Sequence, residues 1–230
     1  MKKSLGAAIG VIGAWALPSA AITAGQVARL LGMETHLQDP RGVALTFDDG
    51  PHPEGTPAVL DMLAQLSAPA AFFLTGEQVV RYPGLAREIC ERGHMIGVHG
   101  HRHCLLPLRT PRASIADLRL ACAVIEHATA VKPRLYRPPY GAANPAVLLA
   151  AHRDGLRPVL WARWGRDWER RASAASVAAA ATHDLRGGEI LLLHDSDHYA
   201  AAGSWRTTVD ALPEIAAAVA HAGLTLRALE

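Results

Sequence analysis

Residues 43–51 of this chain have the sequence VALTFDDGP. The first five, Val43–Phe47, are mostly apolar, which is typical of a strand buried on both faces of a parallel sheet. A Gly-Pro pair then ends the strand in a turn, and the adjacent carboxylates Asp48 and Asp49 lie between strand and turn. By itself, an Asp-Asp-Gly-Pro run is equally typical of a plain turn, so its interpretation depends on polar residues elsewhere in the chain.

Strand-like and helix-like segments alternate through the rest of the chain. After the first strand, further strands are predicted at residues 70–75, 95–98, 134–137, 158–162, 190–193 and 224–228. Helices are predicted at residues 56–66, 77–92, 111–129, 145–153, 173–185 and 207–222. Strands that alternate with helices of this length imply right-handed crossovers and a parallel sheet, so the predicted fold class is α/β.

Several polar residues come just after the predicted strands. They are Asp48, Asp49, His99, His103, Arg137, Asp167 and His194. An open doubly wound sheet would spread these residues along one edge, whereas a closed barrel brings the carboxyl ends of its strands to one face. Their expected convergence on one site favours a (β/α) barrel of about seven strands.

Composition limits the domain organisation and the partners. A chain of 230 residues, half of them hydrophobic, is long enough for one domain with a sizeable core. The formal net charge is +2 and no Lys/Arg-rich block occurs, which argues against nucleic acid as a partner. The three cysteines lack a C-x-x-C spacing, so we expect no disulfide framework and no zinc ribbon. Cys104, beside the histidines, is a minor candidate for a metal ligand.

The amino-terminal segment differs in kind from the rest. Lys2 and Lys3 precede Ser4–Ala28, a stretch without a charged residue, and small residues follow Pro18. This pattern predicts a signal peptide within residues 1–35, with an uncleaved membrane anchor as the alternative. We therefore expect an exported or membrane-anchored protein that faces the cell envelope, with its catalytic domain in residues 36–230.

His99 and His103 supply the partners that the two carboxylates need. A spacing of four residues brings two imidazoles together over one helical turn, which residues 100–104 could form. One carboxylate and two imidazoles make an open metal site with room for water and substrate, and the second carboxylate is then free to act as a base. The pattern indicates metal-assisted hydrolysis. A His-rich surface loop is the alternative, and His101 is expected to point elsewhere.

Two further segments follow predicted strands. The prolines of residues 137–141, Arg-Pro-Pro-Tyr-Gly, stiffen a loop that can hold Arg137 against a carboxylate and aim a backbone N–H into the site. A simple proline turn is the alternative. His194 leaves a fully apolar strand, where it can serve as a general acid, or else it is a core histidine with satisfied hydrogen bonds.

Aromatic residues near these positions suit sugar rings, although core packing is their commoner use. The polar and aromatic segment Asp195–Arg206 is expected at the rim of the site, where it would contribute to substrate choice, with an ordinary barrel loop as the alternative. The predicted substrate-binding residues are Tyr140, Trp164, Trp168 and Trp205.

Taken in order, these motifs resemble those of the polysaccharide deacetylase family, the NodB-like domain of carbohydrate esterase family four. The resemblance covers residues 41–230 and includes five motifs: T-F-D-D-G at 46–50, H-S/T-x-x-H at 99–103, R-x-P-Y/F-G at 137–141, D-x-x-D-W at 164–168 and L-x-H at 192–194. It implies a distorted (β/α) barrel. Two positions depart from the pattern. Gly100 replaces the Ser or Thr of the second motif and so removes a hydroxyl that braces the loop, and Trp164 replaces the first Asp of the fourth motif.

The resemblance implies a metal site and a base. Asp48 would be the general base, and Arg137 would orient it. Asp49, His99 and His103 would hold the metal, either Zn2+ or another divalent ion such as Co2+, Ni2+ or Mn2+.

The resemblance also implies an acid and a reaction. The Tyr140 backbone N–H would contribute to an oxyanion hole, and His194, with its pKa tuned by Asp167, would be the general acid. The enzyme would remove N-acetyl groups from N-acetylglucosamine-type residues of a cell-wall or chitin-like glycan. Two alternatives stay open: an O-acetyl esterase or a deacetylase of a small or lipid-linked sugar, and a non-catalytic glycan-binding protein.

Overall fold

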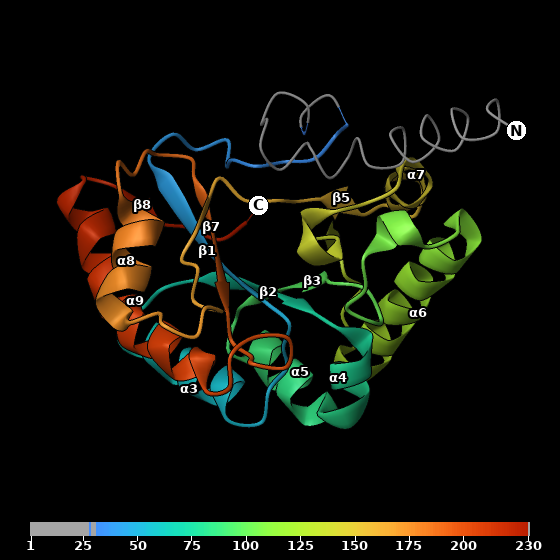
Figure 1. The fold of residues 1–230 in the computed structure, drawn as a ribbon, viewed down its shortest axis with the longest axis horizontal. Helices are drawn as coiled ribbons and strands as arrows, with labels where there is room; N and C mark the ends of the chain where they lie inside the picture. The colour runs from blue at the N-terminus through green and yellow to red at the C-terminus, as the bar shows by residue number, and fades with distance from the viewer. Residues whose placement is uncertain (1–27, 29–30, 230) are drawn as a thin grey trace, which may run out of the picture.

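The structure is a computed structural model that describes residue 28 and residues 31–229 (Figure 1). Most of the predicted leader, residues 1–35, lies outside the described residues. Within the described part of the chain, none of the helices is long and apolar enough to cross a membrane.

Parallel strands form one curled sheet at the centre of the molecule (Figure 1). They are β1 (Gly42–Asp48), β2 (Ala70–Leu74), β3 (Met95–Val98), β4 (Leu135–Tyr136), β5 (Arg157–Pro158), β6 (Arg163–Trp164), β7 (Ile190–His194) and β8 (Thr225–Leu226). Their order is β5-β4-β3-β2-β1-β7-β6, and β8 pairs with the beginning of β1. The predicted α/β class and distorted barrel are confirmed, because the curled sheet makes half a barrel with β5 and β6 at its edges.

The central strand β1 shows how the sheet carries a polar site. All of its residues are buried. Because side chains alternate along a strand, Val43, Leu45 and Phe47 enter the main core, whereas Ala44 joins a smaller cluster on the opposite face. Asp48 lies on the same face as Ala44 by this alternation. The strand therefore ends with a carboxylate inside the half-barrel.

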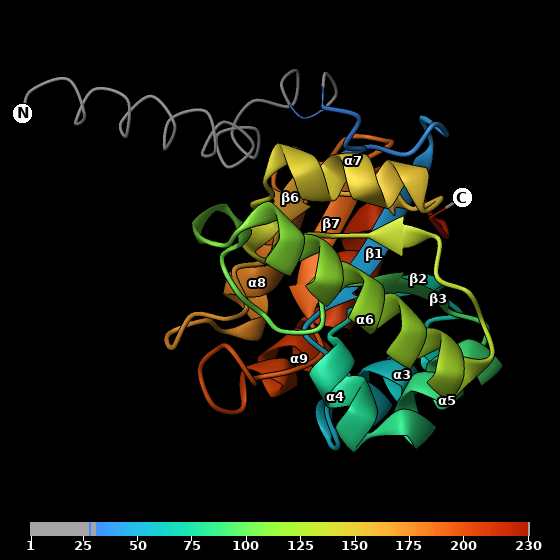
Figure 2. The same cartoon turned by 90° about the vertical axis from the view of Figure 1, so that its right-hand side faces the viewer.

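Helices cover the outside of the sheet, with α3, α8 and α9 on one side and α4 to α7 on the other (Figure 1). Figure 2 shows α6 and α7 in front of the strands. The α-helices are α3 (Gly55–Gln65), α4 (Gly76–Arg81), α5 (Pro83–Glu91), α6 (Pro111–Thr129), α7 (Pro145–Arg153), α8 (Ala174–Thr182) and α9 (Ser204–His221). Two short 3-10 turns, η1 (Leu106–Leu108) and η2 (Pro139–Gly141), lie in loops.

Local capping explains why two helices have the predicted bounds. The side chain of Thr110 accepts a hydrogen bond from the Ala113 N–H at 3.3 Å at the start of α6. Asn144 does the same for the Val147 N–H at 3.0 Å at the start of α7. A proline follows each cap at the first helical position, where its missing N–H costs nothing.

The predicted helix over residues 77–92 is wrong, because the chain forms two helices there. Helix α4 ends at Arg81 and α5 begins at Pro83. Between them, Tyr82 has a non-helical backbone with φ of −131° and ψ of 57°. The proline ring disfavours a helical conformation at the preceding residue and lacks the N–H that a continuous helix would use.

The predicted strand over residues 158–162 is too long, because β5 (Arg157–Pro158) ends at Pro158 and Val159 forms only an isolated bridge with Glu34. This segment leaves β5 at one edge of the sheet and crosses to β6 at the other edge. The carbonyls of Val159 and Leu160 accept hydrogen bonds from the side chain of Arg137, at 3.2 Å and 2.9 Å, instead of from a neighbouring strand. An arginine in the barrel interior thus serves as the donor to these two carbonyls, while the N–H of Val159 still donates to the carbonyl of Tyr136 at 2.8 Å.

Candidate active site

Arg137 fills the interior of the half-barrel and orients the carboxylate at the end of β1. It follows β4, is fully buried, and lies over the ring of Phe73 with 4.0 Å between Cζ and the ring centroid. Its Nη1 donates to Asp48 Oδ1 at 2.7 Å and to Thr46 Oγ1 at 2.8 Å. Burial raises the pKa of Asp48 above its ordinary value, and the charge of Arg137 opposes the shift. The other oxygen, Oδ2, is suited to accept a proton.

Asp49 turns toward the two histidines. Its φ of 77° lies in the left-handed region, which bends the chain immediately after the strand. The carboxylate oxygen Oδ1 lies 3.4 Å from His99 Nε2 and 3.4 Å from His103 Nε2. The structure thus brings together the three predicted metal ligands.

Both histidines are neutral, and His99 presents an unprotonated nitrogen to Asp49. The Nδ1 of His99 donates to the carbonyl of Arg137 at 2.8 Å, which leaves Nε2 with its lone pair. Burial lowers the pKa of His99 and the pKa of His103 to about 3. Neutral imidazoles of this kind are the form that binds a cation.

These three side chains fit a divalent cation. Their ligand atoms all lie within 4.8 Å of one another. Among the described residues, no group donates a hydrogen bond to the buried oxygen Asp49 Oδ1, and a buried oxygen without a partner is costly. Burial raises the pKa of Asp49 to about 7, so the site disfavours a second negative charge beside Asp48 unless a cation balances it. Two imidazoles and a carboxylate are the ligands of open zinc-type sites.

The loop that carries the histidines is not the helical turn that the spacing suggested. Residues 99–105 have no regular structure, because Gly100 takes a φ of 83° and turns the chain. The two imidazole rings still meet, with 5.2 Å between centroids. Cys104 is not part of the ligand group, and its Sγ lies 3.0 Å from Arg109 Nη1. His101 points away and packs against the first residue of α4.

His194 is held by Asp167 at the end of β7. Its Nδ1 lies 2.9 Å from Asp167 Oδ1, and its backbone N–H donates to Asp167 Oδ2 at 2.7 Å. The hydroxyl of Thr208 on α9 donates to the same oxygen at 2.7 Å. Burial lowers the pKa of His194, but the charge and hydrogen bond of Asp167 outweigh it and raise this pKa to about 10. The contacts with Asp167 therefore favour the imidazolium form of His194.

The family model described as Polysaccharide deacetylase matches residues 37–159. This chain belongs to the polysaccharide deacetylase family. It is a hydrolase that acts on amide bonds, as the family assignment and its relatives indicate.

Relatives of this deacetylase come from several bacteria. A chitooligosaccharide deacetylase from Azorhizobium caulinodans is 36% identical over 172 residues, which cover 74% of this chain and 79% of the relative. A peptidoglycan-N-acetylglucosamine deacetylase from Bacillus cereus is 36% identical over 156 residues, or 66% of this chain and 72% of the relative. A solved family 4 carbohydrate esterase from Streptomyces lividans, in complex with acetate, is 28% identical with a TM-score of 0.72, covering 81% of this chain and 92% of that one.

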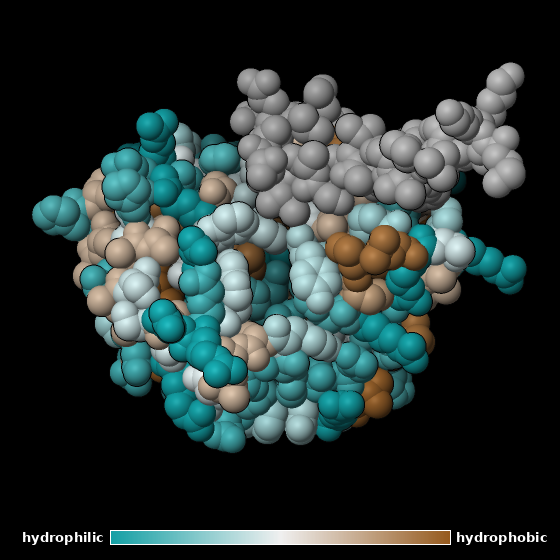
Figure 3. Space-filling model, viewed as in Figure 1, coloured by the Kyte–Doolittle hydropathy of each residue, from teal (hydrophilic) through white to brown (hydrophobic). Residues whose placement is uncertain are grey.

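The deacetylase has a cavity of about 430 Å³ at the carboxyl ends of its strands. Figure 3 shows the molecular surface hollowed near the middle of this face. Asp48, Asp49, His99, His103 and His194 line the cavity together with aromatic residues. Those aromatic residues are Tyr140, Trp161, Trp164, Trp168 and Tyr199. Three of the four predicted substrate-binding residues therefore lie in the cavity wall.

Trp205, the fourth, is not brought to the cavity. Only 9% of its surface is exposed, and its ring lies 6.1 Å from that of His52 and packs against Gly55 at the start of α3. The prediction that Trp205 lies at the rim is wrong. Helix α9 begins at Ser204, and this directs the side chain of Trp205 toward α3. Its neighbours in the segment Asp195–Arg206, Tyr199 and Ala200, reach the cavity instead.

Tyr199 is a site residue to which the sequence assigned no role of its own. Its ring stacks on His103, with centroids 4.3 Å apart and an angle of 17° between planes. Tyr140 contacts the same imidazole at 4.3 Å. The hydroxyl of Tyr199 donates to Glu77 on α4. A tyrosine shortly after the apolar strand of the fifth motif is the sequence signal that could have found it.

A second histidine cluster joins two loops close to the site. His52 Nε2 lies 3.1 Å from Asp197 Oδ1, and His198 is beside them. His52 Nδ1 accepts the N–H groups of Glu54 and Gly55, at 3.2 Å and 2.9 Å, so Nε2 carries the ring proton. A protonated Nε2 has no lone pair for a cation, and we assign this cluster to loop anchoring.

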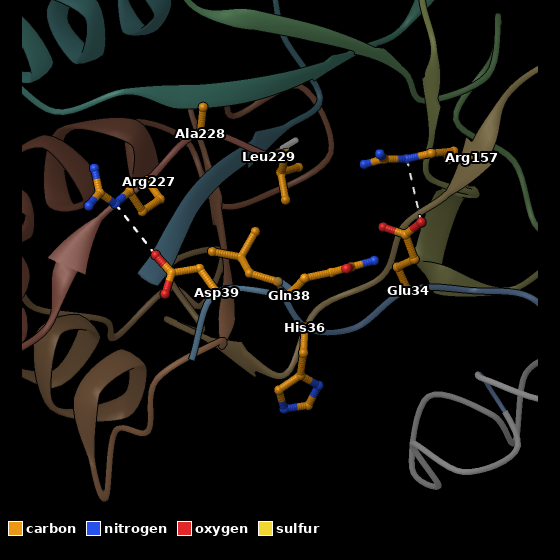
Figure 4. Close-up of a pocket in the computed structure, with 9 residues that line it drawn as sticks. Glu34, His36, Gln38, Asp39, Arg157, Arg227, Ala228 and Leu229 are labelled. Carbon is orange, nitrogen blue, oxygen red and sulfur yellow. Dashed lines mark ion pairs between the residues drawn. The ribbon is translucent and has the colours of Figure 1, made fainter. Parts of the chain in front are cut away.

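Another cavity, of about 510 Å³, lies near the beginning of β1, at the opposite end of the strands (Figure 4). Ion pairs occur on two of its sides, Arg157–Glu34 at 3.4 Å and Arg227–Asp39 at 3.7 Å. Each of these carboxylates faces an arginine, and the described residues of the lining include no Phe, Tyr or Trp on which a sugar ring could stack. We therefore place the chemistry at the carboxyl ends of the strands.

Proposed function

We propose that this deacetylase removes N-acetyl groups from N-acetylglucosamine-type residues of a cell-wall or chitin-like glycan. The observation that carries the proposal is that a candidate base and a candidate acid both lie beside the same three proposed metal ligands. Asp48 Oδ2 lies 3.6 Å from His99 Nε2, and His194 Nε2 lies 3.9 Å from Asp49 Oδ2. A non-catalytic glycan-binding protein would have no use for this pair.

Asp49, His99 and His103 would hold the divalent cation, Zn2+ or a similar ion. Bound there, such a cation supplies Lewis-acid polarisation of the acetamide carbonyl and lowers the pKa of water. Neutral imidazoles and an otherwise unpartnered carboxylate oxygen support this assignment.

Asp48 and His194 move the protons of the hydrolysis. Arg137 engages Asp48 Oδ1, so Oδ2 takes the proton of the attacking water. Asp167 engages His194 Nδ1, so Nε2 gives its proton to the amine nitrogen as the C–N bond breaks. Water and the amide are thereby converted to acetate and a free amino sugar.

The cavity wall suits a sugar ring. Tyr140, Trp164 and Tyr199 each expose between 38% and 55% of their surface, so their ring faces are available for stacking. Tyr140 has a φ of 58°, and we propose that its backbone N–H donates to the developing oxyanion. Trp168 packs edge-on against His194 and helps to exclude water from the acid.

We further propose that the enzyme acts in the cell envelope. The peptidoglycan substrate in the name of the Bacillus cereus relative supports this location, as does the leader pattern of residues 1–35. Export and membrane anchoring through that segment both satisfy the proposal.

The test is acetate release from chitooligosaccharides, peptidoglycan and acetylated xylan. Each substrate is treated with chelator-stripped protein, with the same protein after Zn2+ is restored, and with Asp48→Asn. Release from the N-acetylated glycans that needs Zn2+ and disappears in the variant is the expected result. Release from acetylated xylan alone would replace the proposal with an O-acetyl esterase. Metal binding without any release would favour a binding protein.

A further inference from the structure

The two histidine ligands are supported very differently. The Nδ1 of His99 donates to the carbonyl of Arg137 at 2.8 Å, which fixes its ring. Among the described residues, the buried Nδ1 of His103 has no hydrogen-bond partner. Ring contacts with Tyr140 and Tyr199 limit its tilt, but the place of His103 depends on the main chain of its loop.

The start of helix α4 holds the carbonyl groups of this loop. The N–H of Gly76 donates to the carbonyl of Gly100 at 2.9 Å, and the N–H of Glu77 donates to the carbonyl of His101 at 3.0 Å. These N–H groups belong to the first turn of α4 and have no partner within the helix. One side of the loop is thus tied to a helix end.

Asp117 on helix α6 holds the amide groups of the same loop. Its Oδ2 accepts the N–H of His101 at 2.8 Å and, more weakly, that of Arg102 at 3.4 Å. Its Oδ1 accepts from Arg109 Nη1 at 2.9 Å. Only 8% of Asp117 is exposed, so these charge-assisted bonds are shielded from water.

The geometry of Gly100 links Asp117 to the departure from the family motif. A Cβ atom at Gly100 would lie 3.2 Å from Asp117 Oδ2 and 3.2 Å from the carbonyl oxygen of Arg102, and its φ of 83° disfavours any other residue. The carboxylate of Asp117 therefore occupies the space beside the missing Ser or Thr side chain. A loop without that hydroxyl is braced from a neighbouring helix.

We propose that Asp117 is the positioning residue that keeps His103 in place as a metal ligand. It acts through the main chain at residues 101 and 102 and touches neither substrate nor metal. The inference rests on the proposed function, because it assumes that Asp49, His99 and His103 bind the cation.

The test compares metal affinity with folding stability. Asp117→Ala, Asp117→Asn and the control Asp154→Ala are stripped with chelator and titrated with Zn2+ by calorimetry, and the Tm of each metal-free protein is measured. Asp154 is a matched control because, like Asp117, it pairs with an arginine, Arg119 of α6, at 2.7 Å, and it lies far from the metal loop in the sequence. We expect the Kd for Zn2+ to rise about 10- to 100-fold in Asp117→Ala, less in Asp117→Asn, and not in Asp154→Ala.

A folded Asp117→Ala protein with the wild-type Kd, whatever its Tm, would overturn the inference, since a merely structural role lowers the Tm alone. If Asp117→Ala does not fold, the Kd of Asp117→Asn decides in the same way. Failure of the wild-type protein to bind Zn2+ would instead overturn the proposed metal site itself. The two failures are therefore distinguishable.

Discussion

Arg137 Nη1 lies 2.7 Å from Asp48 Oδ1, and the two side chains are only 0% and 3% exposed. The same guanidinium also donates to the carbonyls of Val159 and Leu160, in the segment that crosses between the edges of the sheet. One side chain therefore holds both the proposed base and the segment at the open side of the half-barrel.

Replacing Arg137 by lysine should damage both activity and stability. Lysine keeps the charge but cannot reach Asp48 and two carbonyl groups with one rigid fork. We expect kcat to fall on the order of 100-fold, because the base is misplaced. We also expect the free energy of unfolding to fall by about 1–3 kcal/mol, since buried acceptors lose their donors. Kinetics and denaturant unfolding measure the two effects. Arg119→Lys, in an exposed pair, is the control, and equal effects in both variants would contradict this prediction.

Asp167→Asn should shift the pH profile toward acid. Asp167 raises the pKa of His194, so loss of its charge must lower that pKa. The acid is active only when protonated, and the alkaline limb of kcat should therefore move to lower pH, by about 1–3 units. The profile is measured from pH 5 to 10 with saturating Zn2+. An alkaline limb at the wild-type position would exclude His194 as the group that causes it.

Zn2+ should raise the Tm of chelator-stripped protein, and His103→Ala should abolish that rise. A ligand at 100 times its Kd stabilises the folded state by about 2.7 kcal/mol. His101→Ala is the control from the same loop, because His101 packs against α4 and does not face the metal ligands. We expect His101→Ala to lower the Tm without metal but to keep the Zn2+-induced rise. Loss of the rise in both variants would point to a general collapse of the loop.

Tyr199→Ala should change substrate preference, and Trp205→Ala should not. Tyr199 lines the cavity and stacks on His103, so its loss removes a wall of the sugar site. Trp205 is buried beside α3, so its loss should cost about 3–5 kcal/mol of stability. The ratio of kcat/KM for chitooligosaccharide and peptidoglycan measures preference. If only Trp205→Ala alters that ratio, then Trp205 and not Tyr199 contributes to substrate preference.

Local patterns were enough to predict β1, its two carboxylates and the two histidines that lie beside Asp49. An apolar run followed by Gly-Pro determines where a strand stops, and ligand types at motif spacing identify the chemistry. The shape of the histidine loop could not be predicted in this way. Its course depends on the backbone of Gly100 and on Asp117, a residue on a helix that follows the loop.

Long-range contacts explain the other differences. The segment predicted as a strand at residues 158–162 has residues that suit a strand. However, the side chain of Arg137, which lies 22 and 23 positions earlier in the sequence, donates hydrogen bonds to the carbonyls of Val159 and Leu160. Thr208 contributes to the acid site from 41 positions away, and nothing in its neighbourhood in the sequence indicates this. The polar segment around Trp205 does not indicate whether this side chain packs against α3 or lines the cavity.

The gap between β5 and β6 has an implication for how the enzyme arises during folding. The segment that crosses this gap is held by the same guanidinium that orients Asp48, so a molecule that has not drawn the crossing segment inward also lacks an aligned base. Such an immature molecule could bind a cation at Asp49 and the histidines and still be unable to cleave a glycan. Alignment of the proposed base would then follow closure of the half-barrel by the crossing segment.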